Sequence, residues 1–217
     1  MNLNSHYTVE INEEPFIVNS TLTAPKTAVV RYFDKDGDEY FSRKYGVVEP
    51  SYIYEKINNG SEVDLSGCYI HGFSLSEYRK KNGIDDVTKV SIQQVKAAGA
   101  FFDSSSIIDF SMAIFEKDAN FTDAHFGKGT VSFHKSVFKG IVNFSKAYFG
   151  KGDADFQFVD FGNGNVTFEE SKFHFGNVIF VNCTFGNGTT NFKKVTFNDG
   201  KVDFHFSQFG EGHKIFD

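Results

Sequence analysis

Seven histidines are the residues of this chain whose type most directly suggests metal binding or acid–base chemistry. His134 and His205 occupy the same position of the internal repeat described below, three coils apart, which puts them roughly 14 Å from one another at the usual strand spacing. His125 falls on another edge of the repeat. None of the three has a cysteine or carboxylate at the spacing of a metal site. We therefore expect surface histidines, with no metal ion and no cofactor.

Aspartates form the second group that could do chemistry. Asp153, Asp155 and Asp160 are close in sequence, but Asp155 and Asp160 lie on successive edges of the repeat and should project apart. A hydrolase with two carboxylates needs a cleft to hold them, and a convex repeat fold offers none. The chain also has no phosphate loop, nucleophile elbow or zinc-ligand pair. The sequence thus favours a protein that is not an enzyme and has no catalytic residues.

The segment 34–38, Asp-Lys-Asp-Gly-Asp, superficially resembles a calcium loop. Its glycine stands fourth instead of sixth, and no glutamate occupies the twelfth position. The segment lies between two runs typical of strands, 28–33 and 39–43, and so predicts a hairpin turn. With further strands expected at 7–11 and 16–18, residues 1–50 form a small β-rich module.

Phenylalanine recurs through the second half of the chain with gaps that alternate between five and six or seven residues. The nineteen members of this series are Phe110, Phe115, Phe121, Phe126, Phe133, Phe138, Phe144, Phe149, Phe156, Phe161, Phe168, Phe173, Phe180, Phe185, Phe192, Phe197, Phe204, Phe209 and Phe216. This spacing fits neither a helix face nor an alternating strand. It is an internal repeat of eleven or twelve residues, which is typical of a stacked solenoid.

Each half-repeat has a small residue, a polar residue and a phenylalanine in succession. The small residue and the phenylalanine should point into one core, and the polar residue between them should face outward and bond to nearby backbone. Glycine, often as Gly-x-Gly, ends most units and predicts corners with positive φ. Four such edges make a coil of about 24 residues, stacked about 4.8 Å from the next.

The triplets Ala119-Asn120-Phe121, Val142-Asn143-Phe144, Ala154-Asp155-Phe156 and Val202-Asp203-Phe204 resemble the pentapeptide-repeat family. The segment Tyr52–Leu75 resembles the opening of many prokaryotic members. This resemblance implies a right-handed quadrilateral β-helix. The chain departs from the family pattern in using phenylalanine where leucine is commoner and in inserting two residues after every second pentapeptide.

The expected organisation is therefore all-β: a module at 1–50, a short helical lead at 51–61, and a solenoid at 62–217. The lead contains a helix over 52–58. Residues 76–99 interrupt the rhythm and are polar and helix-tolerant, so we expect an insertion in the first coil there. The last residues, HKIFD, begin another unit, which suggests either a continuing chain or an open end that stacks on another subunit.

Composition narrows the class of partner. The net charge is −6, but residues 107–217 carry 13 acidic and 11 basic residues, neither a polyanion nor a basic stripe, so nucleic acid is not an expected partner. No secretory signal or membrane span is recognisable, which favours a cytoplasmic protein. Cys68 and Cys183 are far apart and predict no disulfide framework.

Two outward columns differ in character. One column, called the charged column below, alternates in sign and predicts a solvated ladder of weak ion pairs; it contains Asp123, Lys146, Glu170 and Lys194. A second edge carries apolar residues and is our candidate interaction edge; this apolar edge contains Met112, Ile114, Val137, Phe158, Val181 and Phe206. A contiguous exposed apolar patch marks a contact surface, so we expect either the N-terminal module or a partner chain to cover it.

Three functions follow. The first is a non-catalytic scaffold that binds a protein, or itself, through the apolar edge or the open end. The second is a DNA mimic that binds DNA gyrase, as the family resemblance allows; this needs an acidic face, and the alternating charged column argues against one. The third is a recruiting or sensing part of a larger effector or self-assembling protein.

Overall fold

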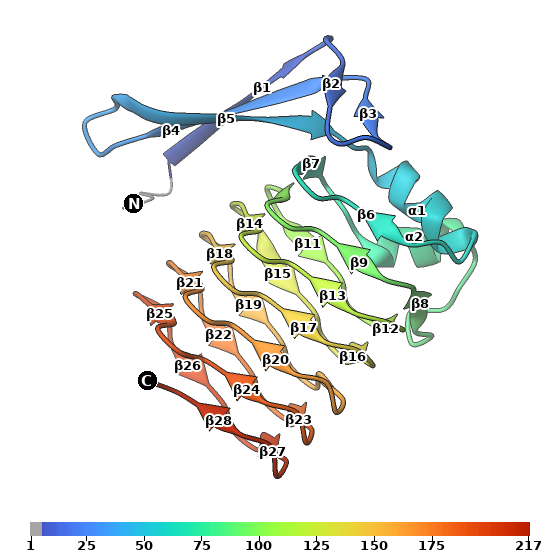
Figure 1. The fold of residues 1–217 in the computed structure, drawn as a ribbon, viewed down its shortest axis with the longest axis vertical. Helices are drawn as coiled ribbons and strands as arrows, with labels where there is room; N and C mark the ends of the chain where they lie inside the picture. Colours follow the sequence, from blue (N-terminus) through green and yellow to red (C-terminus); the bar gives the residue numbers. More distant parts are fainter. Residues whose placement is uncertain (1–5) are drawn as a thin grey trace.

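The computed structural model describes residues 6–217, so the first five residues of the predicted N-terminal module lie outside it. It confirms the predicted fold class: stacked parallel coils form a four-sided β-solenoid, preceded by a small β-rich module, with two short helices. In Figure 1 the N-terminal sheet lies across the end of the solenoid where the coils begin, and the C-terminus lies at the opposite end. Within the described residues, no helix is long and apolar enough to cross a membrane.

The solenoid has four faces, which the chain visits in a fixed order. The first face contains β6 (Val63–Asp64), β9 (Val95–Lys96), β13 (Ala119–Asn120), β17 (Val142–Asn143), β20 (Val166–Thr167), β24 (Thr190–Asn191) and β28 (Lys214–Ile215). The second face contains β7 (Cys68–His71), β10 (Phe101–Asp103), β14 (His125–Phe126), β18 (Tyr148–Phe149), β21 (Lys172–Phe173) and β25 (Thr196–Phe197).

The remaining two faces complete each coil. The third face contains β11 (Ile107–Asp109), β15 (Thr130–Ser132), β19 (Ala154–Asp155), β22 (Val178–Ile179) and β26 (Val202–Asp203). The fourth face contains β8 (Val90–Ile92), β12 (Ala113–Phe115), β16 (Val137–Phe138), β23 (Thr184–Phe185) and β27 (Gln208–Phe209), with Asp160 bridging β16 to β23.

The pairing register gives the length of a coil. On the first face Ala119 pairs with Val142, Val142 with Val166, and Val166 with Thr190, which are steps of 23, 24 and 24 residues. These steps place every repeat unit directly above its equivalent in the preceding coil. Side chains of equivalent positions therefore form straight columns along the solenoid. The outward columns can thus be compared as continuous surfaces.

The outward polar residue of each short strand organises the corner that follows. The Asn120 Oδ1 atom accepts a hydrogen bond from the backbone N–H of Thr122 at 3.0 Å, and the Asp155 Oδ1 atom accepts one from Gln157 at 2.9 Å. In each case the side-chain oxygen of Asn or Asp accepts a hydrogen bond from the N–H two residues later. Such a local bond stabilises the turn without a hydrogen bond from a neighbouring strand. The predicted role of the polar position is confirmed.

Positive φ occurs at different residues from those that the sequence predicts. Nine non-glycine residues adopt it, with φ between 53° and 59°: Met112, Asp123, Lys135, Lys146, Phe158, Glu170, Asn182, Lys194 and Phe206. Among the corner glycines from residue 107 onward only Gly162 does so, whereas Gly67, Gly72 and Gly99 in the first coils also have positive φ. The other repeat glycines are needed for closeness: a Cβ on Gly150 would collide with the carbonyl oxygen of Gly127 in the coil before it. The prediction of positive φ at Gly-x-Gly was therefore wrong except at Gly162, because coil stacking, not turn geometry, excludes a side chain at the other positions.

The core consists of phenylalanine columns, as the repeat predicts. Rings in successive coils stack at centroid distances between 4.4 Å, for Phe115 and Phe138, and 5.5 Å, for Phe138 and Phe161. Rings in neighbouring columns meet edge-to-face, as Phe121 and Phe133 do at 5.7 Å. Burying each ring contributes about 1.5–3 kcal/mol before conformational entropy is subtracted. The columns are thus the main source of stability.

The first coil is closed by helices. Helix α1 (Pro50–Asn58) begins at a proline, two residues before the predicted start, and buries Ile53, Tyr54 and Ile57 against the core. Helix α2 (Leu75–Lys81) begins at the Ser74 cap, whose side chain accepts a hydrogen bond from the Glu77 N–H. Only part of the predicted insertion at 76–99 lies outside the solenoid, because β8 and β9 already belong to its faces.

The N-terminal module is a three-stranded antiparallel sheet of β1 (His6–Asn12), β4 (Thr27–Phe33) and β5 (Glu39–Val47), with a small β2 (Phe16–Ile17)–β3 (Thr23–Ala24) hairpin. The predicted turn between β4 and β5 is confirmed: the Asp34 carboxylate accepts hydrogen bonds from the N–H groups of Asp36 and Asp38. Strand β5 pairs with β7, so the module and the second face form one continuous sheet.

A second hydrophobic core lies between the N-terminal sheet and the outer surface of the second face. Tyr7, Tyr32 and Tyr45 of the sheet pack with Tyr69 and Phe101, which point outward from β7 and β10. This packing fixes the sheet on one side of the solenoid and leaves the opposite side open.

Candidate functional site

The apolar edge runs along the fourth face and the corner that leads into it. Ile114 pairs with Val137, and Met112 and Phe158 occupy equivalent corner positions two coils apart. The structure therefore places the six predicted residues on one edge, but Asp160, Thr184 and Gln208 continue the Ile114–Val137 column and interrupt it with polar side chains.

Exposure is concentrated in two residues of the apolar edge. Phe158 is 46% exposed and Phe206 is 77% exposed, whereas Met112, Ile114, Val137 and Val181 are partly buried. The N-terminal module does not cover this edge, because it packs on the second face and contacts the diagonally opposite corner through Arg43 and Asp123. Of the two covers that we predicted for the apolar edge, the N-terminal module is therefore excluded, and a partner chain stays a prediction.

Phe158 and Phe206 also have an unusual backbone conformation. Phe158 and Phe206 have φ of 57° and 59°, in the left-handed region that bulky side chains avoid and that Asn tolerates. Asn182, at the same corner of the coil between them, is the residue that such a position favours. Two large rings are thus held outward at positions that strain the backbone, and Phe206 buries little surface.

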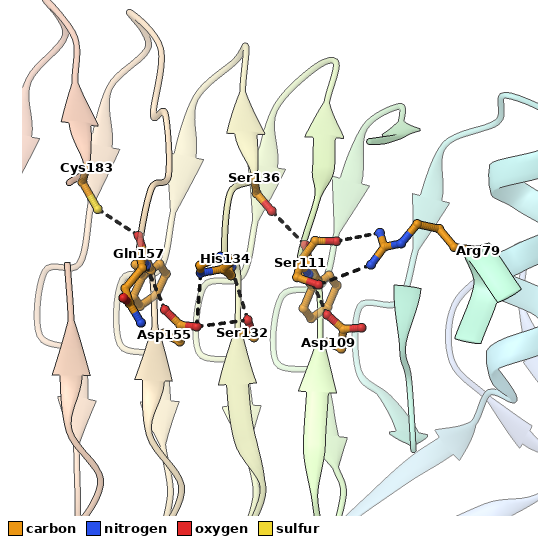
Figure 2. Close-up of polar contacts among 11 residues, drawn as sticks. Arg79, Asp109, Ser111, Ser132, His134, Ser136, Asp155, Gln157 and Cys183 are labelled. Carbon is orange, nitrogen blue, oxygen red and sulfur yellow. Dashed lines mark hydrogen bonds and ion pairs between the residues drawn. The ribbon is translucent and has the colours of Figure 1, made fainter. Parts of the chain in front are cut away.

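A Ser–His–Asp group on the third face is the nearest approach to a catalytic arrangement (Figure 2). The Asp155 carboxylate lies 3.5 Å from the Ser132 hydroxyl and 3.7 Å from the His134 Nδ1 atom. The Ser132 hydroxyl also accepts a hydrogen bond from the His134 backbone N–H. Within residues 6–217, however, no hydrogen bond joins that hydroxyl to the His134 ring, and Ser132 is buried. A nucleophile needs that link to a base, so the group is not arranged for acyl transfer.

The same face holds two buried charges that attach α2 to the solenoid (Figure 2). The Arg79 guanidinium donates to the Ser111 carbonyl at 3.0 Å and to the Ser76 hydroxyl at 3.1 Å. The Asp109 carboxylate accepts from the N–H groups of Ser76 and Ser111, both at 2.8 Å. Burial would raise the pKa of Asp109, but these hydrogen bonds outweigh it and lower the pKa. The Asp109 carboxylate and the two terminal Arg79 nitrogens are thus held through shared serines, whereas Arg79 Nε has no hydrogen-bond partner among the described residues. This arrangement indicates a structural role.

The charged column borders a cleft that the sequence does not predict. The β4–β5 hairpin extends over the second face, and the space beneath it, about 500 Å³, is lined by Phe41, Arg43, Asp123, His125, Lys146, Tyr148, Glu170, Lys172 and Lys194. The expectation that a convex solenoid offers no cleft was therefore wrong here, because the N-terminal module supplies the second wall.

His125 lies at the inner end of this cleft and is not the surface residue that we predicted. Its ring stacks on Phe101 at 5.8 Å, lies 5.6 Å from Tyr148, and approaches the Tyr32 hydroxyl through Nδ1 at 3.4 Å. Burial lowers its pKa to about 4, so the ring is neutral near pH 7. His134 and His205 do lie near the surface, each beside an aspartate.

Both cysteines of the chain lie in the core. Cys68 and Cys183 are both buried and unbridged. The Cys183 Sγ atom donates to the Phe156 carbonyl oxygen at 2.9 Å, and burial raises the pKa of this thiol to about 12. A thiol that stays protonated in a packed core acts as a small apolar residue, as predicted.

Comparisons with known proteins add no assignment: no family model matches this chain, and no curated protein or solved structure is detectably similar to it. A functional assignment consequently depends on the apolar edge and on the cleft beneath the β4–β5 hairpin. The sequence held one signal for the cleft: Phe101, His125 and Tyr148 share an outward register, and aromatic residues alternate on the strands of the N-terminal module.

Proposed function

We propose that this chain is a non-catalytic β-solenoid scaffold of the pentapeptide-repeat type, which binds a protein partner through the apolar edge. The observation that carries the proposal is the pair Phe158 and Phe206, exposed by 46% and 77% at positive φ. The backbone conformation does not single these two residues out, because seven other corner residues share it, but their exposure as large apolar rings does. Large aromatic side chains are also the commonest anchors of protein interfaces.

The spacing of the two rings supports a partner that recognises the fixed distance between them. They lie two coils apart, roughly 10 Å along the solenoid axis, with Asn182 between them. Phe158 is supported from the side by the Lys135 ammonium and the His134 ring. A partner with two apolar pockets at that distance would bury both rings at once.

The DNA-mimic alternative gains no support from the electrostatics. The charged column contains two lysines, and the cleft beside it is lined by four cationic residues and two carboxylates. A surface that imitates duplex DNA needs a continuous negative face.

The test compares the wild-type chain with the double variant Phe158→Asn/Phe206→Asn, in pull-down from a lysate of the source organism. Asparagine already occupies the equivalent corner at Asn182, so the fold is retained. We expect a partner retained by the wild-type chain to be lost by the double variant and kept by Lys146→Asn, a change at an equivalent conformation on the diagonally opposite corner. A partner that binds all three chains equally would contradict the proposal.

A further inference from the structure

The cleft beneath the β4–β5 hairpin is built from two parts of the chain that are about 80 residues or more apart in sequence. Phe41 and Arg43 project from β5 on the side that faces the solenoid, as Tyr45 does. The opposite wall comes from the second face and from the corner that leads into it. The volume of the cleft, about 500 Å³, falls within the range usual for small-molecule sites.

The cationic residues of the cleft exceed what its carboxylates can neutralise. Arg43 pairs with Asp123 at 3.7 Å, and Lys194 pairs with Glu170 at 3.8 Å. Among residues 6–217, Lys146 and Lys172 have no carboxylate within 4.0 Å. These two ammonium groups thus make no ion pair, and the residues that line the cleft carry four positive and two negative charges, in a chain whose net charge is −6.

The two unpaired lysines adjoin aromatic walls. Lys172 stands directly above Tyr148 in the pairing register of the second face, and Tyr148 lies against His125. Phe41 forms the facing wall, where its ring packs on Tyr32 at 5.7 Å. The row of outward aromatic residues Tyr69, Phe101, His125 and Tyr148 therefore ends at a lysine where the cover of the N-terminal sheet also ends.

We propose that this cleft binds a small organic dianion in which an aromatic ring is attached to a phosphate group. The ring would lie between Phe41 and Tyr148, and the phosphate would reach the Lys146 and Lys172 ammonium groups. A phosphate monoester carries a charge of about −1.5 to −2 near pH 7, which matches the two unpaired cations. Charge-assisted hydrogen bonds from lysine to phosphate oxygens would hold it. This site is separate from the apolar edge and does not depend on its function.

Calorimetric titration of the full chain with phenyl phosphate tests the proposal. We expect saturable binding with one ligand per chain, and weaker binding of inorganic phosphate and of phenol, because each lacks half of the recognised chemistry. Lys146→Asn and Lys172→Thr borrow the residues found at Asn182 and Thr196, which occupy comparable corner and strand positions, so they preserve the fold. Each should weaken binding about two- to fivefold, as loss of one exposed charge pair does. The double variant should weaken it about four- to 25-fold if the two effects add.

Lys135→Asn is the matched control, because Lys135 has the same backbone conformation at the diagonally opposite corner. It removes one positive charge without touching the cleft, and phenyl phosphate affinity should stay within about twofold of wild type. The proposal is overturned if phenyl phosphate does not bind, if inorganic phosphate binds equally well, or if Lys135→Asn and Lys146→Asn weaken binding to the same extent.

Discussion

The second face of the solenoid carries two aromatic ladders, one on each side of the same strands. The inner ladder contains Phe102, Phe126, Phe149, Phe173 and Phe197, whose rings stack at 4.4–5.3 Å from β10 to β25. The outer ladder contains Tyr69, Phe101, His125 and Tyr148, at 5.6–5.8 Å. The next residue in its pairing register is Lys172, and the Tyr148 ring also contacts the neighbouring His174 ring at 5.8 Å.

The difference between the ladders lies in what covers them. The inner ladder is enclosed by the other three faces of every coil, so the repeat alone buries it. The outer ladder is covered only where Tyr7, Tyr32 and Tyr45 of the N-terminal sheet lie on it. A repeat can thus specify an enclosed core at any length, whereas an outward aromatic column needs a second folded element to cover it. Where that element ends, the outward column changes from aromatic residues to a lysine.

The largest effect should come from the inner ladder. Phe126→Ala removes a fully buried ring that stacks on Phe102 and Phe149, and we expect a loss of about 3–5 kcal/mol in unfolding free energy. Chemical denaturation measures it. Phe175→Ala is the control, because this ring is 44% exposed, and its loss should stay below about 1 kcal/mol. Equal losses for both variants would show that the phenylalanine columns do not carry the stability.

The outer ladder should make stability depend on pH through His125. Its pKa falls from 6.5 to about 4 on folding because burial disfavours the charged ring. The unfolded chain therefore binds a proton in this window that the folded chain does not, so stability present at pH 7 is lost as the pH drops from 6.5 toward 4. The loss attributable to His125 at about pH 4.5 should be about 2 kcal/mol.

The variant His125→Phe isolates this contribution, because Phe101 shows that the outer ladder accepts a phenyl ring. Denaturation at pH 7 and at about pH 4.5 should show a smaller difference for the variant than for the wild type. A variant with an unchanged pH dependence would mean that His125 is already protonated, or accessible to water, in the folded chain.

The smallest effect on stability is expected at the uncovered corner. Phe206→Asn replaces a ring that is 77% exposed at φ 59° with a residue that tolerates this backbone. The unfolding free energy should stay within about 0.5 kcal/mol of wild type or rise slightly. The reverse change, Asn182→Phe, should lower it by a comparable amount. A clear loss on Phe206→Asn would place this ring in the stabilising core and not on a binding surface.

Several features followed from the sequence because they are local or repeated. The Phe spacing predicted the coil length and the inward columns, and Asn or Asp beside each phenylalanine predicted the turn that Asn120 and Asp155 make. The N-terminal strands and the Asp34 turn followed from alternation and turn chemistry. The glycines were found but misinterpreted, since the contact that excludes a Cβ at Gly150 comes from a residue one coil away.

The sequence by itself determined the four-sided solenoid, because each coil repeats the same short-range pattern and stacking then leaves little choice. Only the tertiary structure decided where the N-terminal sheet docks. That contact joins β5 to β7 and Arg43 to Asp123 across long separations in the chain. It partly buries His125, creates the cleft beside Lys146 and Lys172, and leaves Phe158 and Phe206 open on the far corner. Such a contact depends on the shape of two finished surfaces, which no periodic pattern in the sequence encodes.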